Sequence, residues 1–225
     1  MSRTDMILHH VPASRSFRVL WLMEELGLEA TIKSYSIRDG SMRAPEYLAK
    51  NPLGRAPALE WNGQVVTESG AILQLLAEQN TQAGLDRAVG HDDRARYLEL
   101  FAFAETMASQ IEALNMQHLF LRDPEMQSVT VMKLNTARLR SAMKALEHWL
   151  GEQEYMLPSG LSAVDMMMGF NVVGAPFYVK LDEFPRLTAY RARIKARDAF
   201  QRAQAKDGVQ DFYDQDFYPL PEGRK

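Results

Sequence analysis

Two short stretches decide how this chain folds. Residues 51–59 read Asn-Pro-Leu-Gly-Arg-Ala-Pro-Ala-Leu, and residues 68–72 read Glu-Ser-Gly-Ala-Ile. The first is a Pro/Gly-rich turn that runs into a short apolar strand, and the second is a polar pair that opens an amphipathic helix. Between them, Asn62-Gly63 is a strong signal for a two-residue hairpin turn. The sequence therefore predicts a strand, a tight turn, a second strand and a helix in immediate succession.

The elements before and after this hairpin predict an α/β domain. They are a strand at 6–10, an amphipathic helix at 15–26 that ends at Gly27, a strand at 30–37, a turn of helix after Pro45 and a helix at 69–79. A strand, a helix and a strand in one sheet place the two strands parallel with a right-handed crossover. The hairpin adds two antiparallel strands. The result is a mixed four-stranded sheet, which resembles the thioredoxin fold.

The remainder of the chain has the pattern of a helical bundle. Residues 80–93 are polar and suit a linker, so we expect a thioredoxin-like domain at 1–82 and an all-α domain at 92–225. The predicted helices span 94–121, 126–150, 163–173, 184–197 and 198–205. Ser162 and Asp165 have the spacing of a capping box. We expect the polar and aromatic tail at 207–225 to lie on the surface.

Composition excludes several classes of function. The 225 residues contain 46% hydrophobic and 24% charged residues and carry a net charge of −3, which gives no electrostatic reason to expect nucleic acid or an anionic membrane as partner. No apolar run approaches the ~20 residues that span a bilayer. Residues 1–5 lack the features of a signal peptide. These observations and the absence of cysteine fit a cytoplasmic location.

The residue types available also limit the chemistry. The chain has no cysteine, so disulfides, thiolate metal sites and cysteine nucleophiles are excluded. Its five histidines show no compact ligand spacing, and we expect no metal. A reaction that needs a thiol must therefore take it from a bound molecule.

The order and spacing of several motifs resemble the cytosolic glutathione S-transferases. The stretches that carry the resemblance are 14–22 (Ser-Arg-Ser-Phe-Arg-Val-Leu-Trp-Leu), 24–26, 43–48, 51–59, 68–69 and 162–165. Together they extend over the chain to about Lys206. The match is greatest to bacterial and fungal members that carry Ser-Arg-Ser after the first strand, here residues 14–16. Where tyrosine-type members have a catalytic tyrosine, this chain has His9-His10, which disfavours a tyrosine mechanism.

The resemblance implies a glutathione site. It implies a cis bond between Ala56 and Pro57, with the backbone of Ala56 free to pair with an extended tripeptide. It places the γ-glutamyl carboxylate at Ser69, where the amide and hydroxyl lie at a helix start. Glu68 is then available for the ammonium group. The common structural alternative for this pair is a helix cap. For the glycyl carboxylate, the candidates are Arg55 and Lys50, with Asn51 as a further possibility.

The catalytic candidate is Ser14, with Arg15 as a second source of thiolate stabilisation. Ser14 stands between the first strand and the first helix, four residues before Arg18, as the active serine does in the serine-type members. A hydroxyl donor and a helix dipole both favour an anionic sulfur. Ser16 is the competing hydroxyl, and the structural alternative for Ser14 is a helix cap. Whether His10 faces the site or packs beneath it is open at this point.

The function implied is conjugation of glutathione, as co-substrate, to a small hydrophobic electrophile, typical of detoxification. Val11, Phe103, Met107 and Gln110 are candidates for the electrophile pocket, although Phe103 and Met107 suit a helix core equally well. Glutathione-dependent peroxide reduction, dehalogenation or isomerisation would use the same site. A non-catalytic interaction module with this fold is the alternative from another class. The resemblance also implies a homodimer.

Overall fold

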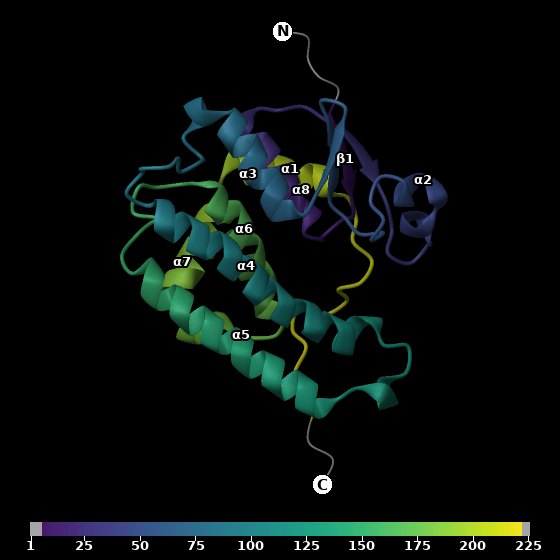
Figure 1. The fold of residues 1–225 in the computed structure, drawn as a ribbon. Coiled ribbons are helices and arrows are strands. Elements are labelled where there is room, and N and C mark those ends of the chain that lie inside the picture. The colour runs from purple at the N-terminus through teal and green to yellow at the C-terminus, as the bar shows by residue number, and fades with distance from the viewer. Residues whose placement is uncertain (1–5, 222–225) are drawn as a thin grey trace. The chain divides into compact units, whose positions relative to one another are not determined.

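The computed structural model describes residues 6–221 (Figure 1). The absence of a signal peptide was inferred for residues 1–5, and the end of the predicted surface tail is 222–225; both segments lie outside the described residues. By backbone proximity the chain divides into two compact units. The first comprises Met1–Val89 with Lys195–Gln210, and the second comprises Gly90–Ile194 with Asp211–Lys225.

Among the described residues, the first unit contains the sheet and four α-helices. In chain order its elements are β1 (Ile7–His10), α1 (Ser16–Leu26), β2 (Thr31–Ser34), α2 (Pro45–Leu48), β3 (Ala58–Trp61), β4 (Gln64–Thr67), α3 (Ser69–Gln79) and α8 (Asp198–Asp207). The strand order is β2-β1-β3-β4, with β1 parallel to β2 and the other two pairs antiparallel. The predicted mixed sheet of a thioredoxin-like domain is confirmed. Helices α1 and α3 lie on one side of the sheet and α2 on the other (Figure 1).

The second strand is shorter than the sequence pattern predicted. Alternation indicated 30–37, whereas β2 is Thr31–Ser34. Its partner β1 ends at His10, which pairs with Ser34, and one further bond joins the Tyr35 amide to the His10 carbonyl at 2.8 Å. Beyond that point no partner strand continues in the described residues, so alternation alone cannot extend the ladder.

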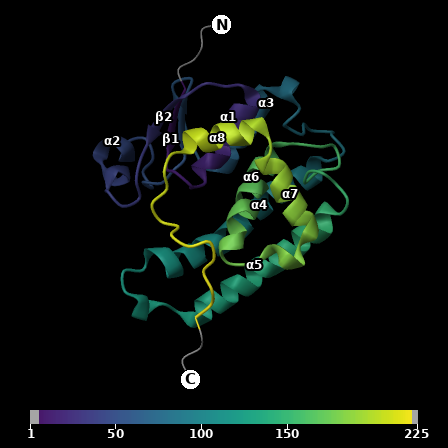
Figure 2. The ribbon, with the colours of Figure 1, turned by 180° about the vertical axis from the view of Figure 1, so that it is seen from behind.

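Helix α8 packs on α1 and so joins the first unit, as seen from behind in Figure 2. Phe200 packs edge-on against Phe17 and Trp21, with ring centroids 5.2 and 5.0 Å apart. Arg197 makes a bidentate pair with Glu25 at 2.7 and 2.8 Å. The predicted division into 1–82 and 92–225 stays a prediction. The structure adds that Lys195–Gln210 belongs to the first compact unit.

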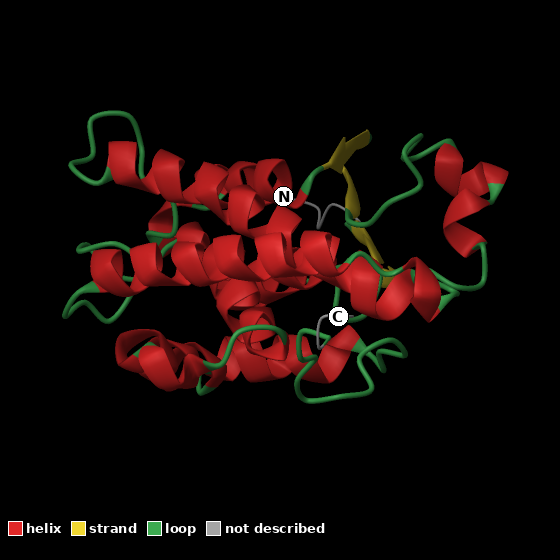
Figure 3. Cartoon of the chain, turned by 90° about the horizontal axis from the view of Figure 1, so that it is seen from below, coloured by secondary structure: helices red, strands yellow, loops and turns green. Residues whose placement is uncertain are grey.

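The second unit is helical (red in Figure 3). Its α-helices are α4 (Arg94–Asn115), α5 (Val129–Leu150), α6 (Ala163–Gly174) and α7 (Pro185–Lys195). Helix α4 packs against α5 and α6, and the Asn171 amide donates to the Ala104 carbonyl at 2.7 Å. The capping box of Ser162 and Asp165 is confirmed at the start of α6. That helix is buried on nearly every face, which agrees with its apolar composition.

The predicted surface position of the C-terminal tail is wrong for its aromatic residues. Tyr218 is 5% exposed, and its amide donates to the Phe177 carbonyl at 2.7 Å. Tyr213 stacks on Phe177 with ring centroids 4.1 Å apart. Large aromatic rings bury enough apolar area to hold a segment that has no regular secondary structure. The polar composition of the tail concealed this anchor.

Candidate functional site

The sheet brings three predicted site segments to one edge. Strand β1 ends at His10, β3 begins at Ala58, and β4 ends at Thr67. Ala58 pairs with both His9 and Thr67. Since β3 is antiparallel to both neighbours, the loop after β1, the turn before β3 and the start of α3 emerge at the same edge. Helices α1 and α3 both begin there, so two positive helix ends lie at this edge.

Ser14 and Ser16 are joined by their hydroxyls at the start of α1. The two Oγ atoms are 2.8 Å apart, and the Ser16 amide donates to Ser14 Oγ at 3.2 Å. Ser14 is partly exposed, whereas Ser16 is fully buried. The Val11 amide donates to Ser16 Oγ at 3.1 Å. Ser14 therefore has the accessible hydroxyl, although it also accepts from the first amide of the helix. Arg15 occupies the N-cap position between them.

His10 lies beneath these hydroxyls, which the sequence left open. Its Nδ1 atom is 2.8 Å from Ser16 Oγ, and its Nε2 atom is 2.9 Å from the Asp207 carbonyl oxygen and 3.2 Å from Asp207 Oδ1. The imidazole is fully buried. The second carboxylate oxygen of Asp207 accepts from the Ala13 amide at 3.0 Å. The end of α8 thus holds both the histidine and the loop that carries Ser14.

Gly208 permits this close approach. It has φ +90°, and a Cβ atom placed on it would lie 3.3 Å from Pro12 Cγ. A side chain there would be strained in the backbone and crowded against the loop. The sequence did not predict a role for Asp207 or Gly208, because they lie almost 200 residues after the loop and carry no local motif.

The start of α3 is tied to the start of α1. Arg18 is fully buried, and its Nη1 atom donates to Ser69 Oγ at 3.0 Å. Ser69 is 4% exposed and is the first residue of α3. Glu68, which precedes it, has φ 68° and ψ 117°, outside the helical region. The first amides of a helix have no intrahelical acceptor, so this end is suited to a carboxylate.

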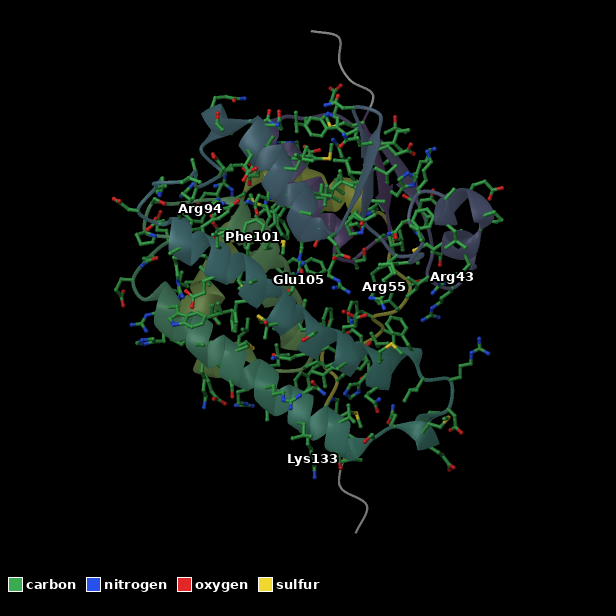
Figure 4. All side chains as sticks on the ribbon, viewed as in Figure 1. Arg43, Arg55, Arg94, Phe101, Glu105 and Lys133 are labelled. Atoms are coloured by element: carbon green, nitrogen blue, oxygen red, sulfur yellow. The ribbon has the colours of Figure 1, made fainter. Side chains whose placement is uncertain are left out.

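The turn before β3 is held by side chains beneath it. The Ala56–Pro57 peptide is cis, as predicted. The Arg55 carbonyl accepts from Asn51 Nδ2 at 2.7 Å and from the Tyr47 hydroxyl. Burial raises the pKa of Tyr47 to about 12, so it remains a donor at neutral pH. The Arg55 side chain is exposed, and Figure 4 shows it on the side of the first unit that carries α2.

Lys50 is already engaged with a carboxylate. Its Nζ atom is 2.6 Å from Glu60 Oε2, and this hydrogen bond is the main reason why the pKa of Glu60 is lowered. The other Glu60 oxygen is 2.9 Å from His9 Nε2, and His9 Nδ1 is 2.9 Å from the Tyr35 hydroxyl. A ligand carboxylate at Lys50 would have to share the ammonium with Glu60. Arg55 is exposed, and its role as the partner of the glycyl carboxylate stays a prediction.

The electrophile pocket stays a prediction. Val11 is in the first unit and is 3% exposed. Phe103, Met107 and Gln110 are on α4 of the second unit. Met107 is fully buried, and Phe103 packs edge-on against Trp149 of α5 with centroids 5.1 Å apart. These two side chains have the contacts of a helix core, the alternative that the sequence left open.

Within residues 6–221 the structure shows no group of three or more acidic or imidazole side chains placed to hold a metal ion. No helix in that range is long and apolar enough to cross a membrane.

Comparison with protein families matches the first unit. Residues 5–78 match the model of the glutathione S-transferase N-terminal domain. Glutathione S-transferase 3 of Schizosaccharomyces pombe is 28% identical over 179 residues, which are 75% of this chain and 74% of that protein. Glutathione S-transferase 1 of Saccharomyces cerevisiae is 40% identical over 85 residues, or 35% of this chain and 36% of that protein.

Solved structures share the fold over most of the chain. A glutathione S-transferase from Actinobacillus pleuropneumoniae has a TM-score of 0.75 and 27% identity and covers 90% of this chain and 92% of its own. The glutathione transferase URE2P6 from Phanerochaete chrysosporium, in complex with oxidized glutathione, has a TM-score of 0.82 at 21% identity, covers 91% and 98%, and supports the fold alone. In sequence over residues 5–78, and in fold over about nine-tenths of its length, the chain is similar to glutathione S-transferases.

Proposed function

We propose that this chain is a cytosolic glutathione S-transferase of the serine type. It binds glutathione, holds its sulfur as a thiolate and conjugates it to a small hydrophobic electrophile. The observation that carries the proposal is the sheet edge where the starts of α1 and α3 meet, with Ser14 at one and Ser69 at the other. The similarity to glutathione S-transferases in sequence and fold supports the same activity.

The γ-glutamyl end of glutathione is assigned to the start of α3. Its carboxylate accepts from the free amides and from the Ser69 hydroxyl, and Arg18 behind Ser69 adds positive charge at 3.0 Å from that oxygen. Glu68 pairs with the ammonium group. The peptide backbone of glutathione pairs with Ala56, and Arg55 takes the glycyl carboxylate. Lys50 is the weaker candidate because Glu60 holds its ammonium at 2.6 Å.

The sulfur is assigned to Ser14. A free thiol has a pKa of ~8.5, so only about 3% is ionised at neutral pH. Lowering that pKa by about two units needs roughly 2.7 kcal/mol of preference for the anion. A hydrogen bond to a charged acceptor contributes ~1.5–3 kcal/mol and the dipole of α1 adds ~0.3–1 kcal/mol. Arg15, at the N-cap of α1, favours the anion further. These terms are sufficient without any other cation.

Other reactions of the same thiolate remain candidates. Peroxide reduction, dehalogenation and isomerisation need the same sulfur and differ in the acceptor. A non-catalytic module is disfavoured because it would not need Ser14, Glu68 and Ser69 together. We also propose a cytoplasmic homodimer, by analogy with the family.

The test is a pair of titrations on the purified chain. Isothermal calorimetry measures glutathione binding, and the ultraviolet absorbance of thiolate measures the pKa of the bound sulfur in wild type and Ser14→Ala. We expect saturable binding by both proteins, with a pKa well below that of free glutathione in wild type and about two units higher in Ser14→Ala. A low pKa in both proteins would move the role to Arg15 or Ser16. Absence of binding would overturn the proposed function.

A further inference from the structure

Three polar groups lead inward from Ser14 to a buried base. Ser14 Oγ is 2.8 Å from Ser16 Oγ, and Ser16 Oγ is 2.8 Å from His10 Nδ1. Ser16 and His10 are both fully buried, whereas Ser14 is partly exposed. The line therefore starts at the surface and ends at an imidazole that solvent does not reach.

The contact of His10 Nε2 with Asp207 determines which ring nitrogen has the hydrogen. Its Nε2 atom faces the Asp207 carbonyl oxygen at 2.9 Å, and a carbonyl can only accept, so Nε2 has the hydrogen. In the neutral imidazole Nδ1 is then an acceptor. It is the nearer of two acceptors for the Ser16 hydroxyl, at 2.8 Å against 3.1 Å for the Val11 carbonyl oxygen. Ser16 Oγ in turn accepts from the Val11 amide at 3.1 Å and from the Ser14 hydroxyl. When Ser16 donates to this nearer acceptor, both hydrogen bonds of the line point from Ser14 toward His10.

We propose that this line is a proton relay and that His10 is the terminal acceptor of the glutathione thiol proton. The inference rests on the proposed function and deepens it. The thiol gives its proton to Ser14 Oγ as the S–H bond breaks. Ser14 passes its own hydroxyl proton to Ser16 Oγ, and Ser16 passes its own to His10 Nδ1. One proton leaves sulfur and one arrives at imidazole, so the products are a thiolate and an imidazolium.

The transfer reverses each hydrogen bond and leaves the site ready for an anion. His10 Nδ1 then donates to Ser16, Ser16 donates to Ser14, and Ser14 donates outward to the sulfur. The same hydroxyl that accepts the proton thereby becomes the donor that stabilises the thiolate. The Ser16 amide, 3.2 Å from Ser14 Oγ, fits both arrangements because it donates in each.

Asp207 is the positioning residue of the relay. One of its carboxylate oxygens lies 3.2 Å from His10 Nε2, on the side of the ring away from Ser16, and the other accepts from the Ala13 amide at 3.0 Å. His9 precedes His10 in β1 and points to the opposite face of the sheet, where Tyr35 and Glu60 contact it. It therefore offers a matched control: a buried histidine of the same strand that has no contact with Ser16.

The test compares thiolate formed with protons released to the solvent. Glutathione is mixed with the wild-type chain in weak buffer at about pH 7, where most imidazoles are neutral. Ultraviolet absorbance reports the thiolate and a pH indicator reports the released proton. S-methylglutathione, which has no thiol proton, gives the background. The same measurement is made on Ser16→Ala, His10→Gln and His9→Gln, with thermal unfolding to verify folding.

We expect wild type and His9→Gln to release far less than one proton for each thiolate formed. Ser16→Ala and His10→Gln should release close to one, or bind glutathione without forming thiolate. One proton released for each thiolate formed in the wild type would overturn the relay and leave the proposed function intact. This outcome does not depend on any variant. A low ratio that persists in both relay variants would also overturn it, because the proton would then be held elsewhere. Absence of glutathione binding would instead overturn the proposed function.

Discussion

Replacing Asp165 with Ala tests whether burial or hydrogen bonding dominates the contribution of this carboxylate, in the capping box of α6, to the free energy of unfolding. The Asp165 side chain is fully buried. One carboxylate oxygen accepts from the Met156 amide at 3.0 Å and the Tyr190 hydroxyl at 3.0 Å, and the other accepts from the Ser162 amide at 2.9 Å. Alanine leaves three buried donors without this acceptor. At about 2 kcal/mol each, their loss costs about 6 kcal/mol.

The burial of the carboxylate acts in the opposite direction. Burial raises the pKa of Asp165 from 3.8 to about 6, against the hydrogen bonds that lower it. A shift of about two units means that, in the folded chain at neutral pH, the ionised carboxylate is disfavoured by about 3 kcal/mol relative to the protonated form. Alanine removes that cost, so we expect Asp165→Ala to lose about 3 kcal/mol of unfolding free energy at about pH 7. Ser162→Ala, which keeps the carboxylate, should lose about 1 kcal/mol.

The pH dependence gives the sharper check. Because the folded pKa is raised, the folded state binds more protons between the unfolded value of 3.8 and about 6. The stabilisation that comes from protonating Asp165 is therefore complete below the unfolded pKa and is lost as pH rises through the folded pKa. The loss caused by Asp165→Ala should grow by about 2 kcal/mol between about pH 7 and about pH 4.

The assay is urea unfolding of the wild type and of Asp165→Ala at each pH, followed by circular dichroism and by tryptophan fluorescence. Trp149 lies in the second unit, as Asp165 does, and so reports on its unfolding. Other carboxylates cancel in the difference between wild type and variant. A loss that shrinks on acidification would refute the reasoning. It would mean that the three hydrogen bonds stabilise the ionised form by more than burial penalises it.

Three further results are expected. Ser69→Ala should weaken glutathione binding about five-fold by calorimetry, since it removes one hydroxyl donor of about 1 kcal/mol and leaves the helix amides; an unchanged affinity would exclude the hydroxyl from the site. Gly208→Ala should lower unfolding free energy by about 1–2 kcal/mol, because φ is +90° and the new Cβ lies 3.3 Å from Pro12 Cγ; thermal unfolding measures it, and a neutral result would show that the end of α8 does not hold the loop. Phe200→Ala should cost about 3–5 kcal/mol and shift the fluorescence of Trp21, which it contacts; loss of stability without that shift would place the effect elsewhere.

The local elements were predictable where one segment supplies its own signal. The helix after Glu68 was predicted at 69–79 and is Ser69–Gln79. Gly27 ends α1 with φ 64° and its amide on the Met23 carbonyl, as its position indicated. The capping box was visible because Ser162 and Asp165 are three residues apart. The end of one helix was not predicted correctly. A single helix was predicted over 94–121, whereas α4 ends at Asn115 and a π-helical turn follows it.

The candidate site divides in the same way. The motifs around Ser14, Pro57 and Ser69 were visible in the sequence because each lies at the junction of a strand with a turn or helix. Their convergence followed once the strand order was known, since parallel and antiparallel pairing sends those junctions to one edge. The status of Lys50 was not predictable, because its partner Glu60 lies on β3, beyond the turn at 51–57, and only the folded chain brings the two charges to 2.6 Å.

By itself the sequence determined the types of element, the mixed sheet and the residues that meet at its edge, because periodicity, turn chemistry and helix caps act over a few neighbouring residues. Only the tertiary structure decided what lies behind that edge. It placed Asp207 and Gly208 against the loop that carries Ser14, and it turned His10 toward Ser16 and His9 toward Glu60. These contacts join residues as many as 197 positions apart. No local pattern encodes them: the contacts of Asp207 and Gly208 arise when α8 packs on α1, and the His9–Glu60 contact arises when β1 pairs with β3.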